Sequence, residues 1–294
     1  MKAYLLISHL RIHNANAMSS PYTIGFPAMT AWLGAIHALQ RKLHAQGCEV
    51  ELSKIAVSCH DFNLQTYKGR GDFVHSIVST ANPLDKDGNR PAFIEEARCH
   101  LDVSLLIELE ECGTKKRAQV LSCIDQLIGS MKFASGDVLS FKKPEILNFD
   151  EDKDQDQQLR PILNKLMLGH VLIERRDLMV ESMRAGQDAL DALLDYLKVT
   201  HSSQLDENQK VIWTSKRKTQ GWLVPIAIGF QGISELGQAK NQRDANTPHR
   251  FAESILTLGE FVMPYRIESL NQLLWQYHVD LENNLYLCQN LITL

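Results

Sequence analysis

The chain has 294 residues, of which 44% are hydrophobic and 22% charged, which is ordinary for a globular protein. Its formal net charge of −4 argues against a protein that binds nucleic acid nonspecifically over a broad basic surface. Its apolar runs are too short to span a bilayer, and its six scattered cysteines include no Cys-x-x-Cys pair. We therefore expect a reduced, cytoplasmic protein without a membrane segment, disulfide framework or zinc finger.

Charge is unevenly distributed along the chain. Residues 150–156 contain five acids and one lysine, a net −4, so the remaining residues sum to zero (−4 minus −4). Their lysines and arginines gather in short clusters, such as Arg41-Lys42 and Lys216-Arg217-Lys218. Most such clusters are solvated faces, but one local basic patch is enough to hold a single short strand of nucleic acid.

The first half of the chain predicts alternating strands and helices. β-rich or alternating runs predict strands, and apolar spacing of three to four residues predicts helices. In chain order we expect a strand at 3–12, a helix at 28–46, β-rich runs at 50–64 and 67–80, turns at 81–91, a strand at 98–109, a helix at 115–131 and a return strand at 133–139. This order is that of an RRM or ferredoxin-like domain, an α+β fold.

The second half is predicted to be mostly helical. The acidic run at 150–158 is the clearest linker, and one apolar strand is expected at 222–230. Helical spacing is found at 158–170, 177–198, 249–262 and 267–278.

The segment that links the first strand to the first helix is unusually polar. It carries Asn14, Asn16, Ser19 and Ser20, more polar groups than a strand-to-helix connection needs. Such side chains can contact base edges, sugar or phosphate. The alternative is that they cap and close a turn, and taken alone these residues favour it.

The helix at 28–46 has two distinct sides. Met29, Trp32, Leu33, Ile36 and Leu43 form a core-facing stripe. Thr30, Gly34, His37, Arg41 and His44 fall within about 80° of one another on another side. That side is either a solvent face with a glycine for close packing, or a surface where an anionic backbone approaches Gly34 and meets Arg41. The helix N-terminus suits a phosphate.

A second basic site is predicted near residue 250. Thr247-Pro248 is a helix-start signal, and Arg243, His249 and Arg250 surround it. Cations oppose the dipole of a helix N-terminus, so their placement suggests an anion or acidic neighbours. The preceding strand ends in Gly229-Phe-Gln-Gly232, where Phe230 can stack on a base or fill the core beside a β-bulge.

Motifs for catalysis and cofactor binding are missing. The sequence has no His-Glu-x-x-His, P-loop, Gly-x-Ser-x-Gly or Gly-x-Gly-x-x-Gly motif. His37 near Ser19 can mimic a ribonuclease base, but no acid partner is evident. We expect no catalytic residue, no metal and no cofactor.

Several segments together resemble one family, the second Csy subunit of type I-F CRISPR complexes, a Cas-five-type RAMP protein. The resemblance rests on residues 14–27 followed by 32–41, 95–106, 221–226, 243–251, 258–261 and 273–278. It implies an RRM-like RAMP core at 1–149, a linker and helical insertion at 150–220, and a strand and helices at 221–294 that complete the fold.

The resemblance also implies a function. The family holds the 5′ handle of the CRISPR RNA without cleaving it, beside the large, Cas-eight-type Csy subunit and the adjacent Cas-seven-type backbone subunit, and supports recognition of target DNA. Candidate RNA contacts are then the loop from Asn14 to Ser20, His37, Arg41 and the segment from Arg243 to Arg250. Two alternatives stay open: a metal-independent endoribonuclease on the same fold, and an adaptor that contacts only proteins.

Overall fold

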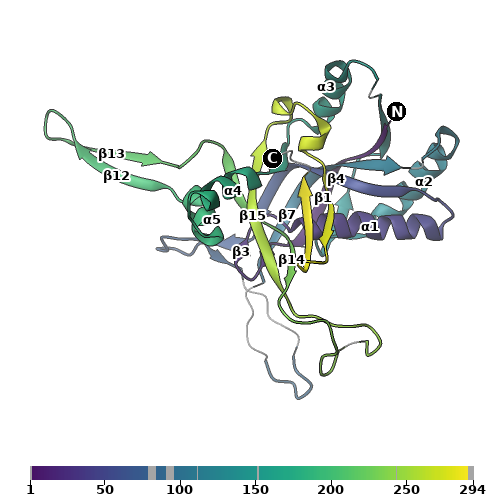
Figure 1. The fold of residues 1–294 in the computed structure, drawn as a ribbon, viewed down its shortest axis with the longest axis horizontal. Helices are drawn as coiled ribbons and strands as arrows, with labels where there is room; N and C mark the ends of the chain where they lie inside the picture. The colour runs from purple at the N-terminus through teal and green to yellow at the C-terminus, as the bar shows by residue number, and fades with distance from the viewer. Residues whose placement is uncertain are drawn as a thin grey trace.

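The computed structural model describes residues 2–78, 84–90, 96–110, 112–150, 152–242 and 244–290. These residues form a mixed α/β protein with a large antiparallel sheet, five α-helices and a long hairpin that projects to one side (Figure 1). None of the helices in these ranges is long and apolar enough to cross a membrane.

The N-terminal half follows the predicted order of elements. It contains β1 (Lys2–Asn16), α1 (Met29–Ala45), β4 (Glu51–Leu64), β7 (Arg98–Glu110), α2 (Arg117–Ile128) and β9 (Gly136–Ser140). In space the strands lie in the order β4-β7-β1-β9, and each neighbouring pair is antiparallel. The two strands that α1 connects are therefore separated by β7. The predicted helices and the strands at 50–64 and 98–109 are confirmed.

Alternation along β1 builds two cores on opposite faces of the sheet. Leu5 and Ile7 pack with the buried stripe of α1. Tyr4 and Leu6 pack on the other face with α3 (Gln155–Leu166). β1 is longer than predicted and has register shifts at two left-handed residues, His9 (φ 50°) and Asn14 (φ 59°). Each bulge shifts the alternation by inserting a residue, and so changes which side chains point to each face of the sheet.

The C-terminal half extends the same sheet. It contributes β11 (His170–Glu174), β14 (Trp222–Gly232), β15 (Ala252–Val262), β16 (Trp275–Asp280) and β17 (Leu285–Asn290). They lie in the order β11-β15-β14-β17-β16-β4, and β11 also pairs with β4, so the pairings form a closed circuit. β10 (Glu145–Phe149), which was not predicted, pairs with β1.

Two predicted helices are wrong. Residues 252–262 form strand β15, which lies between β14 and β11, so pairing on both edges overrides the local Thr247-Pro248 signal. Gly259 fits this position because a Cβ there would lie 2.9 Å from a methyl group of Leu172. Residues 267–278 contain instead a 3-10 turn, η3 (Leu270–Gln272), followed by the start of β16, and another 3-10 turn, η2 (Pro264–Arg266), precedes them.

The middle segment differs in detail from its prediction. α3 begins inside the expected acidic linker because the Asp154 carboxylate accepts from the backbone N–H groups of Asp156 and Gln157. The single helix predicted at 177–198 is two, α4 (Arg176–Arg184) and α5 (Ala189–Leu197), separated at Gly186 (φ 100°). The projecting hairpin, β12 (Thr200–Leu205) and β13 (Val211–Lys216), was not predicted.

Five short strands complete the structure. They are β2 (Met18–Ser20), β3 (Thr23–Ile24), β5 (Thr66–Tyr67), β6 (Ser76–Ile77) and β8 (Lys132–Phe133). The strand expected at 67–80 is therefore limited to a few residues, and its end, like part of the turn region at 81–91, lies outside the described residues. The return strand expected at 133–139 is a hairpin of β8 and β9 that turns at Ala134 and Ser135.

Candidate nucleic-acid interface

The polar segment after β1 is held together mainly by its own side chains. The Asn16 amide oxygen accepts from the Met18 N–H at 3.0 Å, and its amide nitrogen donates to the Met18 carbonyl at 3.1 Å. Ser19 and Ser20 hydroxyls both lie within hydrogen-bond distance of the Thr23 hydroxyl, at 2.9 and 2.7 Å. Ser20 is buried, which leaves it little surface for a ligand. Asn14 is exposed and occupies the second bulge of β1.

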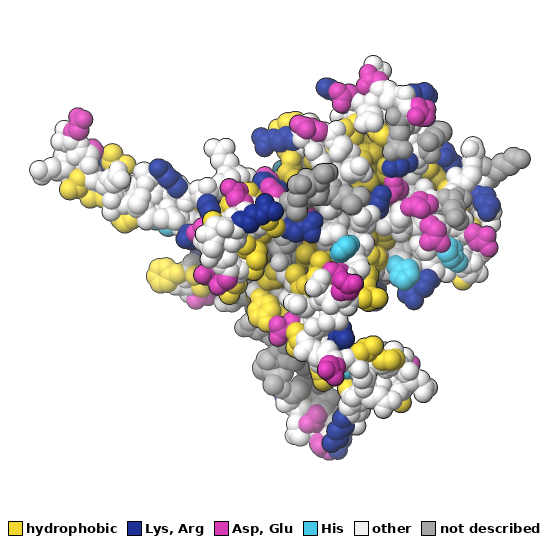
Figure 2. All heavy atoms as spheres, viewed as in Figure 1, with side chains coloured by type: hydrophobic (Ala, Val, Ile, Leu, Met, Phe, Trp, Pro, Cys, Tyr) yellow, Lys and Arg dark blue, Asp and Glu magenta, His cyan; other side chains and the backbone are white. Residues whose placement is uncertain are grey.

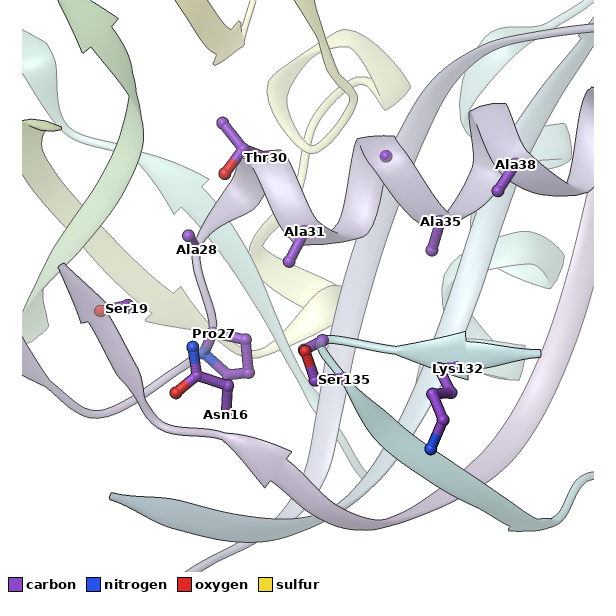
Figure 3. A pocket seen from close by; sticks show the side chains of 12 residues that line it. Asn16, Ser19, Pro27, Ala28, Thr30, Ala31, Ala35, Ala38, Lys132 and Ser135 are labelled. Atoms are coloured by element: carbon purple, nitrogen blue, oxygen red, sulfur yellow. The ribbon is translucent and has the colours of Figure 1, made fainter. Parts of the chain in front are cut away.

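Asn16 and Ser19 line one side of a cleft that opens along α1 (Figure 3). We call it the loop–helix cleft. Its volume is about 440 Å³, its floor is made of small helix residues, and its far wall is the β8–β9 turn. The floor consists of Ala28, Thr30, Ala31, Gly34, Ala35 and Ala38. A Cβ built on Gly34 would meet no atom within 4 Å, so this part of the helix backbone is open to an approaching ligand.

The N-terminus of α1 faces this cleft without a side-chain cap. Ala28 occupies the N-cap position, no side chain bonds to the first turn, and the first turn contains no acidic residue. Helix N-terminal N–H groups without protein acceptors are favourable sites for an anion. The cleft can therefore accept a phosphate at one end.

His37 and Arg41 lie further along the same helix. Both are exposed, and neither makes a hydrogen bond or an ion pair with the part of the chain that the structure describes. Arg41 lies seven residues after Gly34, a rise of about 10 Å. That distance places a cation beyond the cleft, along the direction of the helix. Lys132, on the far wall of the cleft, is paired with Asp137 at 2.6 Å.

The second predicted site is arranged differently from its prediction. Arg243 lies outside the described residues, and no helix begins at residue 249, so the argument from the helix dipole fails. His249 pairs with Gly237 through an isolated bridge, and its ring lies edge-on to Phe251. The Arg250 side chain packs on Gly232 and donates to the Asn284 amide oxygen, while its Nε atom is buried without a partner.

Phe230 lies two residues before Gly232 on β14, and its side chain is 43% exposed. The end of β14 thus brings Phe230 near the Arg250 segment. None of these residues lines the loop–helix cleft. On the face shown in Figure 2, Lys and Arg side chains are scattered among acidic ones rather than joined in one basic surface.

A histidine cluster that the sequence analysis missed lies on β1, β4 and β7. His9 stacks on His60 with ring centroids 4.4 Å apart, and its Nδ1 lies 3.2 Å from an Asp102 carboxylate oxygen. His60 Nε2 lies 2.7 Å from the Ser104 hydroxyl, and burial lowers the pKa of His60 below its ordinary value. The alternation of His100, Asp102 and Ser104 in β7 indicates a polar face of this strand. The sequence does not show that His9 faces it, because the bulge at His9 interrupts the alternation of β1.

Three of these groups lie close enough to raise the question of a metal ion. The ligand atoms of His9, His60 and Asp102 lie within 4.8 Å of one another. The two rings are only 22° from parallel, so their in-plane lone pairs run side by side instead of converging on one point. We interpret the group as a hydrogen-bonded cluster.

The chain has clear relatives among known proteins. It matches the family model described as CRISPR-associated protein (Cas_Csy2) over residues 5–288. It is 34% identical over 310 residues to the CRISPR-associated protein Csy2 of Pseudomonas aeruginosa (strain UCBPP-PA14). That alignment covers 97% of this chain and 94% of the relative. The similarity therefore includes both halves of the sheet and both candidate sites.

Proposed function

The chain belongs to the Csy2 family of CRISPR-associated proteins, and from this premise we propose that it is a non-catalytic, RNA-binding subunit of a cytoplasmic type I-F CRISPR Csy complex. In this role it holds the 5′ handle of the CRISPR RNA beside the large, Cas-eight-type subunit and the adjacent Cas-seven-type backbone subunit. It thereby supports recognition of target DNA without contributing a reaction step.

The fold supports this proposal. The strand order β9-β1-β7-β4, with α1 and α2 as the connections, supports our proposal of a ferredoxin-like, RAMP-type core. We propose that residues 1–149 form this core, that 150–220 form an insertion and that 221–294 complete the sheet. Residues 150–220 hold α3, α4, α5 and the projecting hairpin, together with β11, which pairs with β15 and β4 in the large sheet.

The loop–helix cleft is the observation that carries the proposal. It combines an uncapped helix start with the open backbone at Gly34, and Arg41, a cation without a partner among the described residues, lies beyond it on the same helix. To bind an RNA backbone, a surface needs unobstructed access, N–H donors and positive charge, arranged along one line. A chain with a net charge of −4 can supply that locally for one fixed strand.

The test compares two arginines in the full-length chain. Arg41→Ala removes the cation beside the cleft, whereas Arg160→Ala removes an exposed arginine of α3, on the opposite face of the sheet, that also has no partner among the described residues. Binding of labelled single-stranded RNA is measured by anisotropy over a range of salt concentrations. We expect Arg41→Ala to weaken binding and to reduce the salt slope by about 0.7, the value for one phosphate contact on a single strand. Equal binding by both variants would refute the assignment of Arg41.

A metal-independent endoribonuclease is the second candidate, and the histidine cluster is the observation that favours it. His9 is paired with Asp102, and the pKa of its neighbour His60 is lowered. Two neighbouring imidazoles of this kind can accept and donate protons in acid–base catalysis. Incubating the chain with repeat RNA in the presence of EDTA separates the two functions. Intact RNA is the expected result. Cleavage that His60→Ala or His37→Ala abolishes would favour the nuclease instead.

A further inference from the structure

A second cleft lies where β4, β11, β14 and β15 meet the segment from Ile24 to Phe26. Its volume is about 420 Å³, and we call it the aromatic cleft. Four rings on its walls form a continuous chain: Phe62 contacts Phe26, Phe26 contacts Phe261, and Phe261 contacts Trp222, with centroids 5.2 to 6.3 Å apart. The two end members, Phe62 and Trp222, are 37% and 56% exposed. The chain of rings thus ends in solvent on both sides.

The polar side chains of the cleft include the carboxylate of Asp61 and the imidazole rings of His60 and His170. No lysine or arginine among the described residues lines it. The Asp61 side chain is exposed and makes no hydrogen bond or ion pair within the described ranges. His170 lies edge-on to Trp222, at 5.4 Å. A phosphate is therefore a poor ligand here, whereas a flat ring that carries an amino group finds both a stacking surface and an acceptor.

The aromatic cleft and the loop–helix cleft are lined by adjacent parts of the chain. Phe26 lines the former and Pro27 the latter, and these are consecutive residues. The start of α1 is therefore close in the chain to the lining of the aromatic cleft, which would let a strand with a phosphate at the helix start place a neighbouring base in the aromatic cleft. Sequence-specific proteins read single-stranded RNA in this way, by stacking unpaired bases on aromatic side chains.

We propose that the aromatic cleft receives one unstacked base of the bound RNA, with Trp222 stacked on the base and Asp61 accepting from its exocyclic amino group. This inference rests on the proposed function, because it names a subsite for the same RNA. It requires a base with an exocyclic amino group, which uracil lacks.

The four tryptophans of the chain allow a direct test. Trp32 and Trp275 are fully buried, and Trp213 and Trp222 are exposed, so Trp213→Phe leaves Trp222 as the only exposed indole. The full-length Trp213→Phe protein is titrated with oligocytidylate and oligouridylate of about twelve nucleotides, a length within the range of single-strand-binding folds. Anisotropy of labelled RNA reports binding, and quenching of Trp222 emission reports stacking.

We expect oligocytidylate to quench Trp222 over the same concentrations at which it binds. In the otherwise wild-type chain, Trp222→Ala should weaken binding by about 5- to 150-fold, the usual range for losing one base–aromatic stack. Trp222→Phe should keep most of the affinity. Tyr265→Ala should keep all of it, because Tyr265 is an aromatic residue that is also well exposed but does not line the cleft. Asp61→Ala should abolish the preference for oligocytidylate over oligouridylate.

The outcomes separate this inference from the function it rests on. RNA that binds without quenching Trp222, and binds Trp222→Ala as tightly as wild type, would overturn the inference and leave RNA binding intact. Equal affinity of the wild-type chain for the two homopolymers would overturn the role of Asp61. If neither RNA binds any form of the chain, both proposals are overturned.

Discussion

Replacing Gly34 by leucine should stabilise the fold and weaken RNA binding. Glycine inside a helix is less favourable than other residues, and no atom lies within 4 Å of a Cβ at this position. Gly34→Leu should therefore raise the free energy of unfolding by about 0.5–1 kcal/mol. For a chain of this length the increase corresponds to a rise of roughly 1–2 °C in the unfolding temperature.

The same side chain would occupy the loop–helix cleft. If an RNA phosphate can then no longer reach the N–H groups at the start of α1, at least one charged hydrogen bond is lost, at about 1.5–3 kcal/mol. RNA affinity should fall about 10- to 150-fold. The assays are thermal unfolding and RNA anisotropy, with Ala45→Leu at the exposed end of the same helix as the control.

The substitution should raise the stability of the fold and lower its RNA affinity, and these opposite effects make the result easy to interpret. A stabilised Gly34→Leu protein that binds RNA as tightly as wild type would refute the idea that RNA occupies this cleft. A strongly destabilised protein would instead show that Gly34 is needed for packing, which contradicts the open geometry of the helix backbone.

Three further predictions concern stability. Burial raises the pKa of the Glu174 carboxyl to about 7 from an ordinary 4.5, so this group stabilises the folded state at low pH and its contribution is lost as pH rises between those values. Glu174→Gln should remove this pH dependence. At pH 8 its free energy of unfolding should exceed that of the wild-type chain by at most about 3 kcal/mol. Urea unfolding at pH 5 and pH 8 measures this, and Glu253→Gln, at an exposed position, should leave the free energy of unfolding unchanged. Asp188→Ala should cost about 1 kcal/mol in the same assay, because the Asp188 carboxylate accepts from the Asp191 N–H at the start of α5. Replacing the hairpin residues 201–215 by a short linker should leave the unfolding temperature nearly unchanged, since almost all its side chains are exposed; a large decrease would show that the hairpin contributes to the core.

Helices and strands with a buried stripe could be predicted from the sequence. The periodicity of α1 and α2, and the alternation in the first half of β7, reflect burial on a single face, which is visible locally. The secondary structure of residues 252–262 could not be predicted in this way. This segment is a strand because β14 and β11 pair with its two edges, and both partners are distant in sequence.

The candidate sites show the same division. The polar segment after β1 and the unusual side of α1 could be recognised from residue types, and the structure brings Asn16, Ser19 and Gly34 to one cleft. The helix start expected at Thr247-Pro248 does not exist, so the reason for expecting an anion there is lost. The stacking of His9 on His60 depends on a bulge in β1, and the ring chain from Phe62 to Trp222 joins four separate segments. Neither leaves a local pattern in the sequence.

The most direct test of the central claim is to map the RNA contacts of the chain itself. Full-length protein bound to CRISPR RNA is irradiated with ultraviolet light, and the cross-linked peptides are identified by mass spectrometry. The account predicts adducts on residues 14–41, from the end of β1 through α1. Adducts confined to α3 and the opposite face of the sheet, with none on residues 14–41, would contradict it.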